Sequence, residues 1–376
     1  MTVPGGEERL LLHQNPQSVM GPRPATMFTL QTGFAAINYS TRGALPQMIQ
    51  AITVEAALST EQKGVLLSAF FPIYCMLMIP AGYLVKNCGA KLSVTLDLCT
   101  HAVALLLFPT LGRVFGVPGM VVCLSLLGAA QTPIFPVLNT LRRDWLPKDA
   151  SRAWVLQMMR VGGSTSSVLI KMLVPRMMRR WGWTAVPYAF GGVSAAFAIV
   201  WHSLAADKPE AVQSPAADGS APPADREEKA KEPFSWRLFR VPAVLACMLS
   251  HVADNNTKYA VSQWAPTMYA ALGATPVETG TFLAVPGVCG FCVSWLVAAV
   301  EMRLTQKGVP DKTTRRHVSF VANTWQGLAT IGFAVARSPL QMCIANCCIM
   351  FSLQFQNLSV SLHLFVCATV ISEMQL

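Results

Sequence analysis

Four cationic side chains stand inside long apolar runs of this chain: Arg42, Arg160, Lys171 and Lys258. A Lys or Arg at the centre of a bilayer costs at least about 2.5–3.5 kcal/mol, so a cation that is kept there needs a partner, a wet cavity or a function. A fixed guanidinium can hold a carboxylate or a phosphate through two parallel hydrogen bonds. The chemistry that these residues indicate is therefore anion binding within a membrane.

Arg42 is the strongest candidate among them. Asn38 lies one helical turn earlier on the same face, and Glu55, at the far end, is the one acidic residue on this apolar run. We expect Arg42 and Asn38 to contact an anionic ligand. The alternative is an Arg that pairs structurally or reaches the membrane surface.

Lys258 offers a second cation in a polar stretch. Asp254 precedes it by four residues, so the two side chains share a helix face and can neutralise each other. The sequence leaves open whether they form a structural pair or Lys258 is a second anion contact. Asn255, Asn256 and Tyr259 add hydrogen-bonding groups, which makes this stretch too polar to face lipid.

The remaining charged and titratable residues of the apolar runs receive plainer interpretations. Lys171 is expected to be structural, with its amine reaching a membrane interface, and Arg160 stays undecided. His251 and His363 are expected to form helix–helix hydrogen bonds rather than a proton relay.

The elements that must position these residues are membrane helices. The chain has 376 residues, of which 53% are hydrophobic and 13% are charged, against about 25% charged in soluble domains. Apolar runs of roughly 20 residues can cross a bilayer, and in lipid such runs must be helices. We predict an all-α membrane protein with about ten spans, at residues 27–52, 64–85, 91–112, 117–141, 153–175, 183–205, 240–270, 278–300, 317–337 and 340–371.

The charge pattern gives a topology and a division of the chain. The net charge is +10, but most Lys and Arg fall in the N-terminal tail and the even-numbered connections if the N-terminus is cytoplasmic. Nucleic-acid binding is therefore not expected. We predict a cytoplasmic tail at 1–26, a six-helix bundle at 27–205, a cytoplasmic linker rich in Ala, Pro, Asp, Lys and Glu at 206–239, and a four-helix bundle at 240–376.

Enzyme and metal chemistry find no support in the sequence. The eleven Cys lie almost wholly in apolar runs, and the pair Cys289 and Cys292 has no His cluster nearby, so these thiols are interpreted as small packing residues. No acid–base pair, nucleophile–base set or phosphate-binding glycine loop stands out. We expect no enzyme activity, cofactor, metal or structural disulfide.

The turn after the second predicted span carries a family resemblance. It is similar to the pattern Gly-x-Leu-x-Asp-x-x-Gly-x-Lys of the major facilitator superfamily, matched by Gly82, Leu84, Gly89 and Lys91, with Lys86 in the place of the Asp. Within this superfamily the chain resembles the anion/cation symporters, including the sodium–phosphate, sialin, vesicular glutamate and plastid ascorbate/phosphate transporters. The residues that carry the branch resemblance are Leu66, Ser68, Phe70, Phe71, Tyr74, Ile79, Pro80, Tyr83, Gly128, Phe135, Pro136, Trp145, Pro147, Ser151, Arg152, His251, Asn255, Tyr259, Trp264, Pro266 and Tyr269.

The resemblance implies a fold, a transport cycle and residue roles. The family has two six-helix halves with substrate held between them near mid-membrane. Twelve helices are therefore expected for the family, and we expect about ten in this chain, without the last two. Arg42 is similar to the substrate-binding Arg, and Tyr74 and Gln131 are expected to line the path. Gating is expected to involve the turn residues Gly82, Lys86, Gly89 and Lys91 with Arg142, Arg143 and Arg152.

Three departures from the family pattern change the expectation. Gln131 stands where the family often carries a proton-coupling acidic residue, which favours uniport or potential-driven movement. Lys86 replaces the Asp of a cytoplasmic latch and would repel Arg142 and Arg143, so that latch should be weak. The tenth span ends without the acidic and Pro residues of the family.

The leading hypothesis is secondary active or potential-driven transport of a small organic anion or phosphate by alternating access. Its partners would be the anion, the lipid bilayer and a co-transported Na⁺ or H⁺, which the sequence does not decide. The alternative is a truncated, non-transporting paralogue that acts as a membrane interaction or regulatory protein. The host membrane stays open among plastid, lysosomal or vesicular, and plasma membranes.

Overall fold

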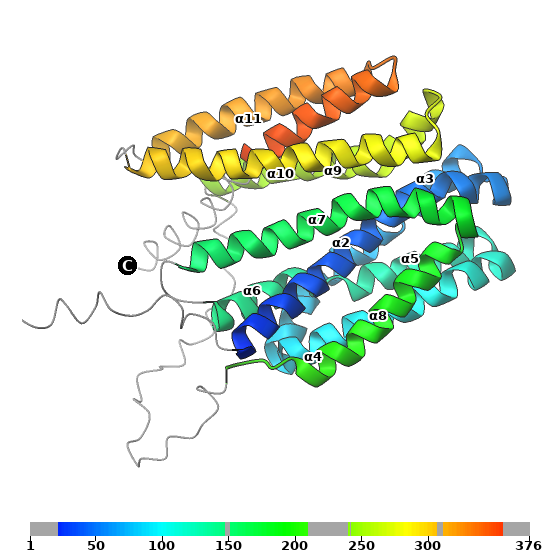
Figure 1. Ribbon diagram of the computed structural model, residues 1–376, viewed down its shortest axis with the longest axis horizontal. Helices are drawn as coiled ribbons and strands as arrows, with labels where there is room; N and C mark the ends of the chain where they lie inside the picture. Colours follow the sequence, from blue (N-terminus) through cyan, green and yellow to red (C-terminus); the bar gives the residue numbers. More distant parts are fainter. Residues whose placement is uncertain (1–21, 147–150, 210–239, 241, 307–310, 356–376) are drawn as a thin grey trace, which may run out of the picture.

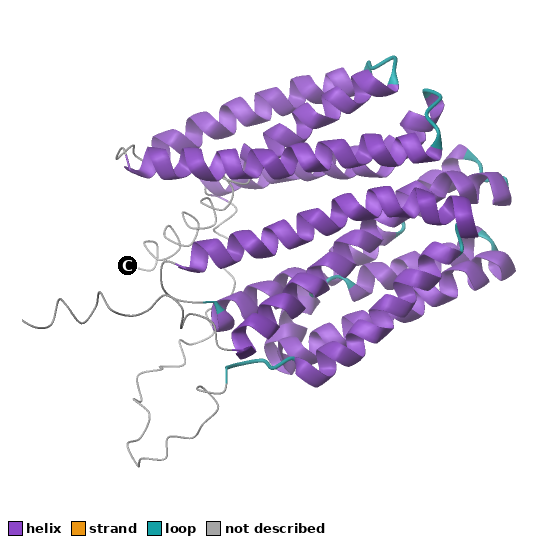
Figure 2. Cartoon of the chain, in the orientation of Figure 1, coloured by secondary structure: helices purple, strands orange, loops and turns teal. Residues whose placement is uncertain are grey.

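A computed structural model describes residues 22–146, 151–209, 240, 242–306 and 311–355 of the chain. Within these ranges every regular element is a helix (Figure 2), so the predicted all-α class is confirmed. Most of the predicted tail (1–21) and linker (210–239) lies outside the described residues, as does the part of the last predicted span beyond residue 355.

Eleven helices account for the described ranges, and each predicted span overlaps at least one of them. Their bounds are α2 (Pro22–Ala56), α3 (Thr60–Ser68), α4 (Phe70–Phe115), α5 (Val117–Ala130), α6 (Ile134–Trp145), α7 (Ser151–Trp181), α8 (Ala185–Leu204), α9 (Pro242–Ala271), α10 (Pro276–Gln306), α11 (Asp311–Ala334) and a last helix at Pro339–Phe355.

Two of the predicted spans contain an irregular turn. The span predicted at 64–85 is divided between α3 and α4 at Ala69, and the span predicted at 117–141 is divided between α5 and α6 at residues 131–133. A proline ring clashes with the carbonyl four residues earlier and removes a backbone donor. Pro72 follows the first break, and Pro133 lies within the second.

A one-residue turn inside α4 separates the second and third predicted spans. Gly89 has φ 82° and ψ 166°, a conformation that is essentially restricted to glycine. The backbone N–H of Lys91, just beyond it, donates to Oδ1 of Asp207 at 2.8 Å. The indole N–H groups of Trp145 and Trp201 donate to the carbonyl oxygens of Asp207 and Lys91, at 3.2 and 3.1 Å. The turn is thereby joined to the ends of α6 and α8.

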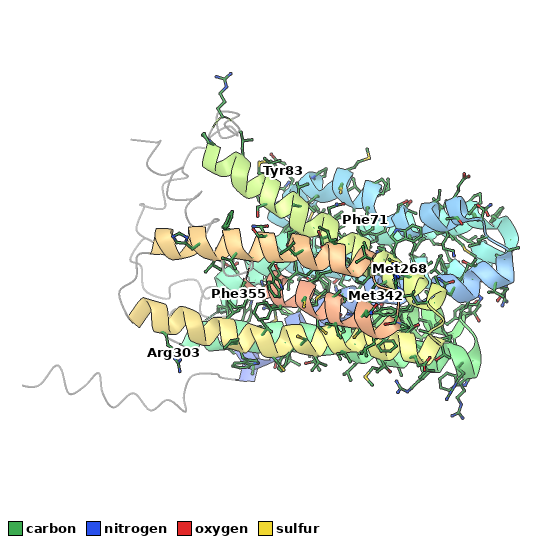
Figure 3. All side chains as sticks on the ribbon, turned by 90° about the horizontal axis from the view of Figure 1, so that it is seen from above. Phe71, Tyr83, Met268, Arg303, Met342 and Phe355 are labelled. Atoms are coloured by element: carbon green, nitrogen blue, oxygen red, sulfur yellow. The ribbon has the colours of Figure 1, made fainter. Side chains whose placement is uncertain are left out.

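The helices run side by side in one bundle (Figure 1). Helices α9, α10 and α11 form one layer beside the layer that contains α2 and α7, and α10 packs on α7 while α9 packs on α2. Two buried apolar clusters belong to α2–α8, and a third belongs to α9–α11 and the last helix. Met268 and Met342, labelled in Figure 3, contribute to the third cluster.

Hydropathy divides the helices into two kinds. Among the described residues, four segments are long and apolar enough to cross a membrane by composition alone: Pro80–Phe115, Val117–Trp145, Ala185–Leu204 and Pro276–Val297. Helix α2 is less apolar because it buries Gln31, Asn38, Ser40, Thr41 and Gln47. Polar side chains inside a membrane protein face the bundle interior rather than lipid. The polar content of α2 therefore fits its place against α7 and α9.

We predict that Gly89→Ala destabilises the protein by about 1–3 kcal/mol, because an added Cβ would adopt a strained φ and approach Oδ1 of Asp207 to 2.9 Å. Thermal unfolding of the purified protein in detergent measures the change. Gly192→Ala is the matched control, since Gly192 is in α8 and a Cβ there meets nothing within 4 Å. Equal unfolding midpoints for the two variants would contradict the structural role of this turn.

Candidate functional site

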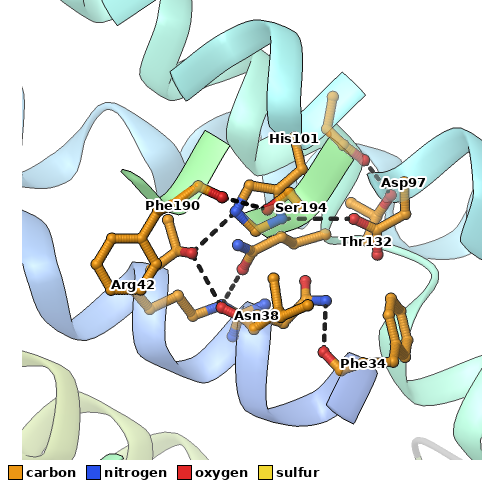
Figure 4. Close-up of polar contacts among 12 residues, drawn as sticks. Phe34, Asn38, Arg42, Asp97, His101, Thr132, Phe190 and Ser194 are labelled. Atoms are coloured by element: carbon orange, nitrogen blue, oxygen red, sulfur yellow. Dashed lines mark hydrogen bonds and ion pairs between the residues drawn. The ribbon is translucent and has the colours of Figure 1, made fainter. Parts of the chain in front are cut away.

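Arg42 lies in the middle of α2 between two aromatic rings and an amide. Its guanidinium carbon is 4.9 Å from the ring centroid of Phe70 and 4.8 Å from that of Tyr74. Its Nε donates to Oε1 of Gln131 at 2.5 Å, as Figure 4 shows. Ring faces attract cations, and the amide satisfies a donor without neutralising the charge. The site thus holds a positive charge in place by neutral groups.

The helix breaks explain this geometry. Gln131 is the residue at which α5 ends, so its side chain is presented from an interrupted helix rather than from a regular helix face. Phe70 begins α4 directly after the break at Ala69, and Tyr74 follows one turn later, so the two rings stack at 5.2 Å. The two proline-associated breaks therefore place three partners around one guanidinium.

Two buried nitrogen donors at this site make no hydrogen bond within the described part of the chain: Nη2 of Arg42 and Nε2 of Gln131. The hydroxyl of Tyr74 lies beside the same guanidinium and is a further polar group. A buried donor without an acceptor costs about 1–3 kcal/mol. A ligand that supplies acceptor oxygens would remove this cost, and an anion would also balance the charge.

The second group of helices contributes Lys258 and Tyr259 of α9. Lys258 lies close enough to Arg42 and Asp254 for their charges to act on it, and its side chain is exposed. It therefore lines accessible space rather than the packed core. The ring of Tyr259 meets that of Phe71 edge to face at 5.0 Å, which joins α9 to α4 beside Arg42.

Asp254 is held from a third helix. It accepts a hydrogen bond from Nε2 of Gln326 in α11 at 3.4 Å. Asp254 thus has a partner besides Lys258. Lys258 can therefore interact with Asp254 and still contact an anion.

The other predicted binding residues make no hydrogen bond with Arg42 among the described residues. Asn38 is buried and donates to the carbonyl of Phe34 at 3.0 Å within α2. Asn255 is half-buried and Asn256 is exposed, and neither makes a hydrogen bond within the described residues. The structure thus brings Arg42, Tyr74 and Gln131 together, with Lys258 and Tyr259 opposite.

The structure describes most of the predicted gating residues one by one. Gly82 lies within α4, Lys86 is exposed, Arg142 is half-buried, and the side chain of Arg152 lies outside the described residues. Arg143 is exposed and donates to its neighbour Asp144 at 2.8 Å. The backbone N–H of Lys91 donates to Asp207, a residue that sequence reasoning placed in the linker.

Sequence reasoning missed a buried polar pair in α4, Asp97 and His101. Nε2 of His101 lies 3.0 Å from Oγ1 of Thr41, and its Nδ1 lies 3.9 Å from Oδ1 of Asp97. The signal was available, because an Asp and a His four residues apart within an apolar run share one helix face.

Lys171 of α7 is directed toward α10 rather than along the helix to a surface. Its Nζ lies 3.9 Å from the position that a Cβ at Gly287 would occupy, and Gly280 packs against the Lys171 carbonyl. The prediction that the Lys171 amine reaches a membrane interface is not what the structure shows, because Gly287 leaves room for it between α7 and α10. The side chain of Arg160 lies outside the described residues.

Fold and site define an all-helical membrane protein with cations from two groups of helices facing one another. Residues 30–372 match the sequence model of the Major Facilitator Superfamily, and the chain belongs to this superfamily. It is a multi-pass membrane protein, as predicted.

The curated relatives agree with the anion/cation symporter branch that the sequence predicted. The chain is 25% identical to the rice (Oryza sativa subsp. japonica) protein "Probable anion transporter 4, chloroplastic", over 74% of this chain and 46% of the relative. It is 24% identical to "Ascorbate transporter, chloroplastic" of Arabidopsis thaliana, over 73% and 49%. The chain spans about half the length of these relatives.

Solved structures share the fold at low sequence identity. A bacterial homologue of the human lysosomal transporter Spinster, inward-facing and unoccupied, gives a TM-score of 0.66 at 13% identity, over 93% of this chain and 80% of that chain. The superfamily transporter FucP in its outward conformation gives 0.56 at 17% identity, over 94% and 92%. These likenesses establish the fold alone.

We predict that Gln131→Ala destabilises the protein by about 1–3 kcal/mol, because Nε of Arg42 loses its acceptor. Gln131→Glu should raise the unfolding temperature above that of the parent in anion-free buffer, because a carboxylate would pair with Arg42. Thermal unfolding in detergent tests both variants. Asn139→Ala, at an exposed position of α6, is the control. An unfolding temperature of Gln131→Ala equal to that of the parent would contradict this role of Gln131.

Proposed function

We propose that this protein carries a small anion across a membrane by alternating access, with Arg42 as the residue that binds the anionic group. The observation that carries the proposal is the state of the guanidinium. It is held by two rings and one amide, and its Nη2 is buried without a hydrogen bond within the described residues. A cation held in this way is suited to an exchangeable counter-ion.

The charge balance around Arg42 supports an anionic substrate. Among the described residues no carboxylate lies within 4.0 Å of the guanidinium, so the cation has no resident ion-pair partner there. Nη2 of Arg42, Nε2 of Gln131 and the Tyr74 hydroxyl are buried donors without acceptors among the described residues. A phosphate or carboxylate accepts hydrogen bonds from a planar guanidinium in a two-point arrangement.

The opposite group of helices would complete the site. Lys258 is exposed and within the field of Arg42, so the two cations can act on one anion from opposite sides. Asn255, Asn256 and Tyr259 would add neutral contacts from α9, and Asn38 would add one from α2. The relatives named for anion and ascorbate transport support the anionic class, without deciding between phosphate and an organic carboxylate.

Alternating access would use the contact between α7 and α10. A Cβ at Gly280 would lie 2.6 Å from the Lys171 carbonyl, and a Cβ at Gly287 would lie 2.7 Å from the Val168 side chain. These glycines allow close helix approach between the proposed bundles at 27–205 and 240–376. In this proposal the bundles rock about that contact, the linker at 206–239 joins them, and the residues around Gly89 and Arg142 gate the cytoplasmic end.

We predict that Arg42→Gln lowers anion uptake at least about tenfold, because loss of charge-assisted hydrogen bonds worth about 1.5–3 kcal/mol corresponds to that factor or more. Arg42→Lys should retain part of the uptake, since it keeps the charge but loses the planar fork. The measurement is uptake of phosphate, glutamate, ascorbate and sialate by purified protein in liposomes under an imposed potential.

Arg113→Gln is the matched control, because it removes the same charge at an exposed site near the end of α4. It should leave uptake unchanged. Uptake of one anion by the parent and by Arg42→Gln at equal rates would overturn the assignment of Arg42. Absence of uptake by well-folded parent would instead favour a non-transporting membrane interaction protein.

A further inference from the structure

Asp97 and His101 form a buried pair in α4 that anion binding at Arg42 does not use. Their exposed fractions are 2% and 0%. Neither carboxyl oxygen of Asp97 accepts a hydrogen bond of ordinary geometry from the described residues, and the Asn38 amide is the neutral donor that lies near it. An acidic residue inside a membrane protein is expensive and is kept where it is paired, faces water or carries a proton. The surroundings of this pair indicate the last of these.

The hydrogen bonds of Thr41 identify which nitrogen of His101 carries hydrogen. The Thr41 hydroxyl donates its single hydrogen to the carbonyl of Ile37 at 2.9 Å. With its hydrogen on that carbonyl, the hydroxyl accepts from Nε2 of His101, 3.0 Å away, and we assign the hydrogen of the neutral imidazole to Nε2 on this basis. In a neutral imidazole the other nitrogen, Nδ1, is then a bare acceptor. That nitrogen faces Oδ1 of Asp97 at 3.9 Å.

Two acceptors that face each other repel, and one proton between them reverses this. A carboxylic acid that points at a bare Nδ1 leaves no net charge buried, whereas an imidazolium beside a carboxylate leaves two charges to desolvate. We propose that Asp97 holds an exchangeable proton directed at His101, and that this proton is taken up together with the anion at Arg42. The second part rests on the proposed transport function.

The neighbours of the pair come from α2, from α8 and from the turn between α5 and α6. Arg42 in α2 acts electrostatically on both Asp97 and His101. Among the described residues it is the charged side chain with this influence on the pair. The other polar neighbours in Figure 4 are neutral: Asn38 and Thr41 from α2, Thr132 from the break between α5 and α6, and Ser194 from α8. Protonation of Asp97 therefore changes the balance of charge around Arg42 directly.

That change couples the proton to the anion. An ionised Asp97 attracts the guanidinium of Arg42 and competes with a bound anion for it, whereas a protonated Asp97 does not. Proton binding thus favours anion binding, and by linkage the anion favours the proton to the same extent. A proton from the aqueous phase forms an O–H bond on Asp97 during loading, and that bond is broken when the proton leaves on the opposite side with the anion. Asp97 would thus provide the proton coupling that Gln131 cannot provide, since an amide does not titrate.

The first test uses the full chain in liposomes with a panel of phosphate, glutamate, ascorbate and sialate. The parent should take up its anion faster when the loading side is acidic, with alkalinisation of that side. Asp97→Asn keeps the shape of the side chain and removes the proton site. It should retain potential-driven uptake but lose stimulation by the pH gradient at least tenfold. Equal stimulation of parent and Asp97→Asn would overturn the proposal.

An infrared difference spectrum between acidic and alkaline buffer tests the proton site without transport. The parent should show the carbonyl band of a protonated carboxylic acid, which disappears as the pH rises. Asp97→Asn should lack the band, and Glu61→Gln, at an exposed position of α3, should keep it. His101→Gln removes the acceptor Nδ1 and should shift the pH at which the band disappears.

The two readouts separate the two proposals. The carboxylic acid band without any anion uptake would leave the proton site standing and refute transport. Anion uptake with a band that survives Asp97→Asn, or with no band in the parent, would refute the proton site and leave transport standing. If Asp97→Asn fails to fold, an unchanged band in His101→Gln across the pH range refutes the proton site.

Discussion

The structure depends on keeping one guanidinium charged inside a membrane protein. A cation at that depth is costly, and a resident carboxylate would neutralise it and occupy its hydrogen-bond donors. This chain instead surrounds Arg42 with the rings of Phe70 and Tyr74 and the amide oxygen of Gln131. Each of these neighbours stabilises a cation without cancelling it. The irregular turns at Ala69 and at residues 131–133 adjoin Phe70 and include Gln131, and they help to position these side chains beside Arg42.

The same constraint orders the helices around the site. Segments that are apolar throughout, such as Ala185–Leu204, qualify as membrane spans by composition. Helix α2 carries buried amides and hydroxyls and lies against α7 and α9, where the two groups of helices meet. Glycines at 280 and 287 let α10 approach α7 closely. Polar side chains are thus concentrated where the proposed carrier would admit its anion, and lipid is left to the apolar helices.

Sequence reasoning reached the helical class and the family, because hydropathy and the tight turn at Gly89 are local signals. It also singled out Arg42, whose functional role stays a prediction. It could not reach contacts that depend on tertiary packing. Asp207 was assigned to a linker by composition, yet it binds the backbone of Lys91, more than a hundred residues earlier. The bond between His101 and Thr41 joins two helices that the sequence does not pair. Two predicted spans contain irregular turns near Pro72 and Pro133, since a Pro inside a membrane helix can kink it.

The position of a bound anion tests the central claim most directly. Selenate or another anomalously scattering oxyanion can be located in crystals of the full chain by its anomalous signal. The account predicts one site within hydrogen-bond distance of Nη2 of Arg42, the donor that is buried without an acceptor among the described residues, with Gln131 Nε2 beside it. An anion bound elsewhere, while Arg42 keeps its present contacts and Nη2 stays without a ligand, would contradict the account.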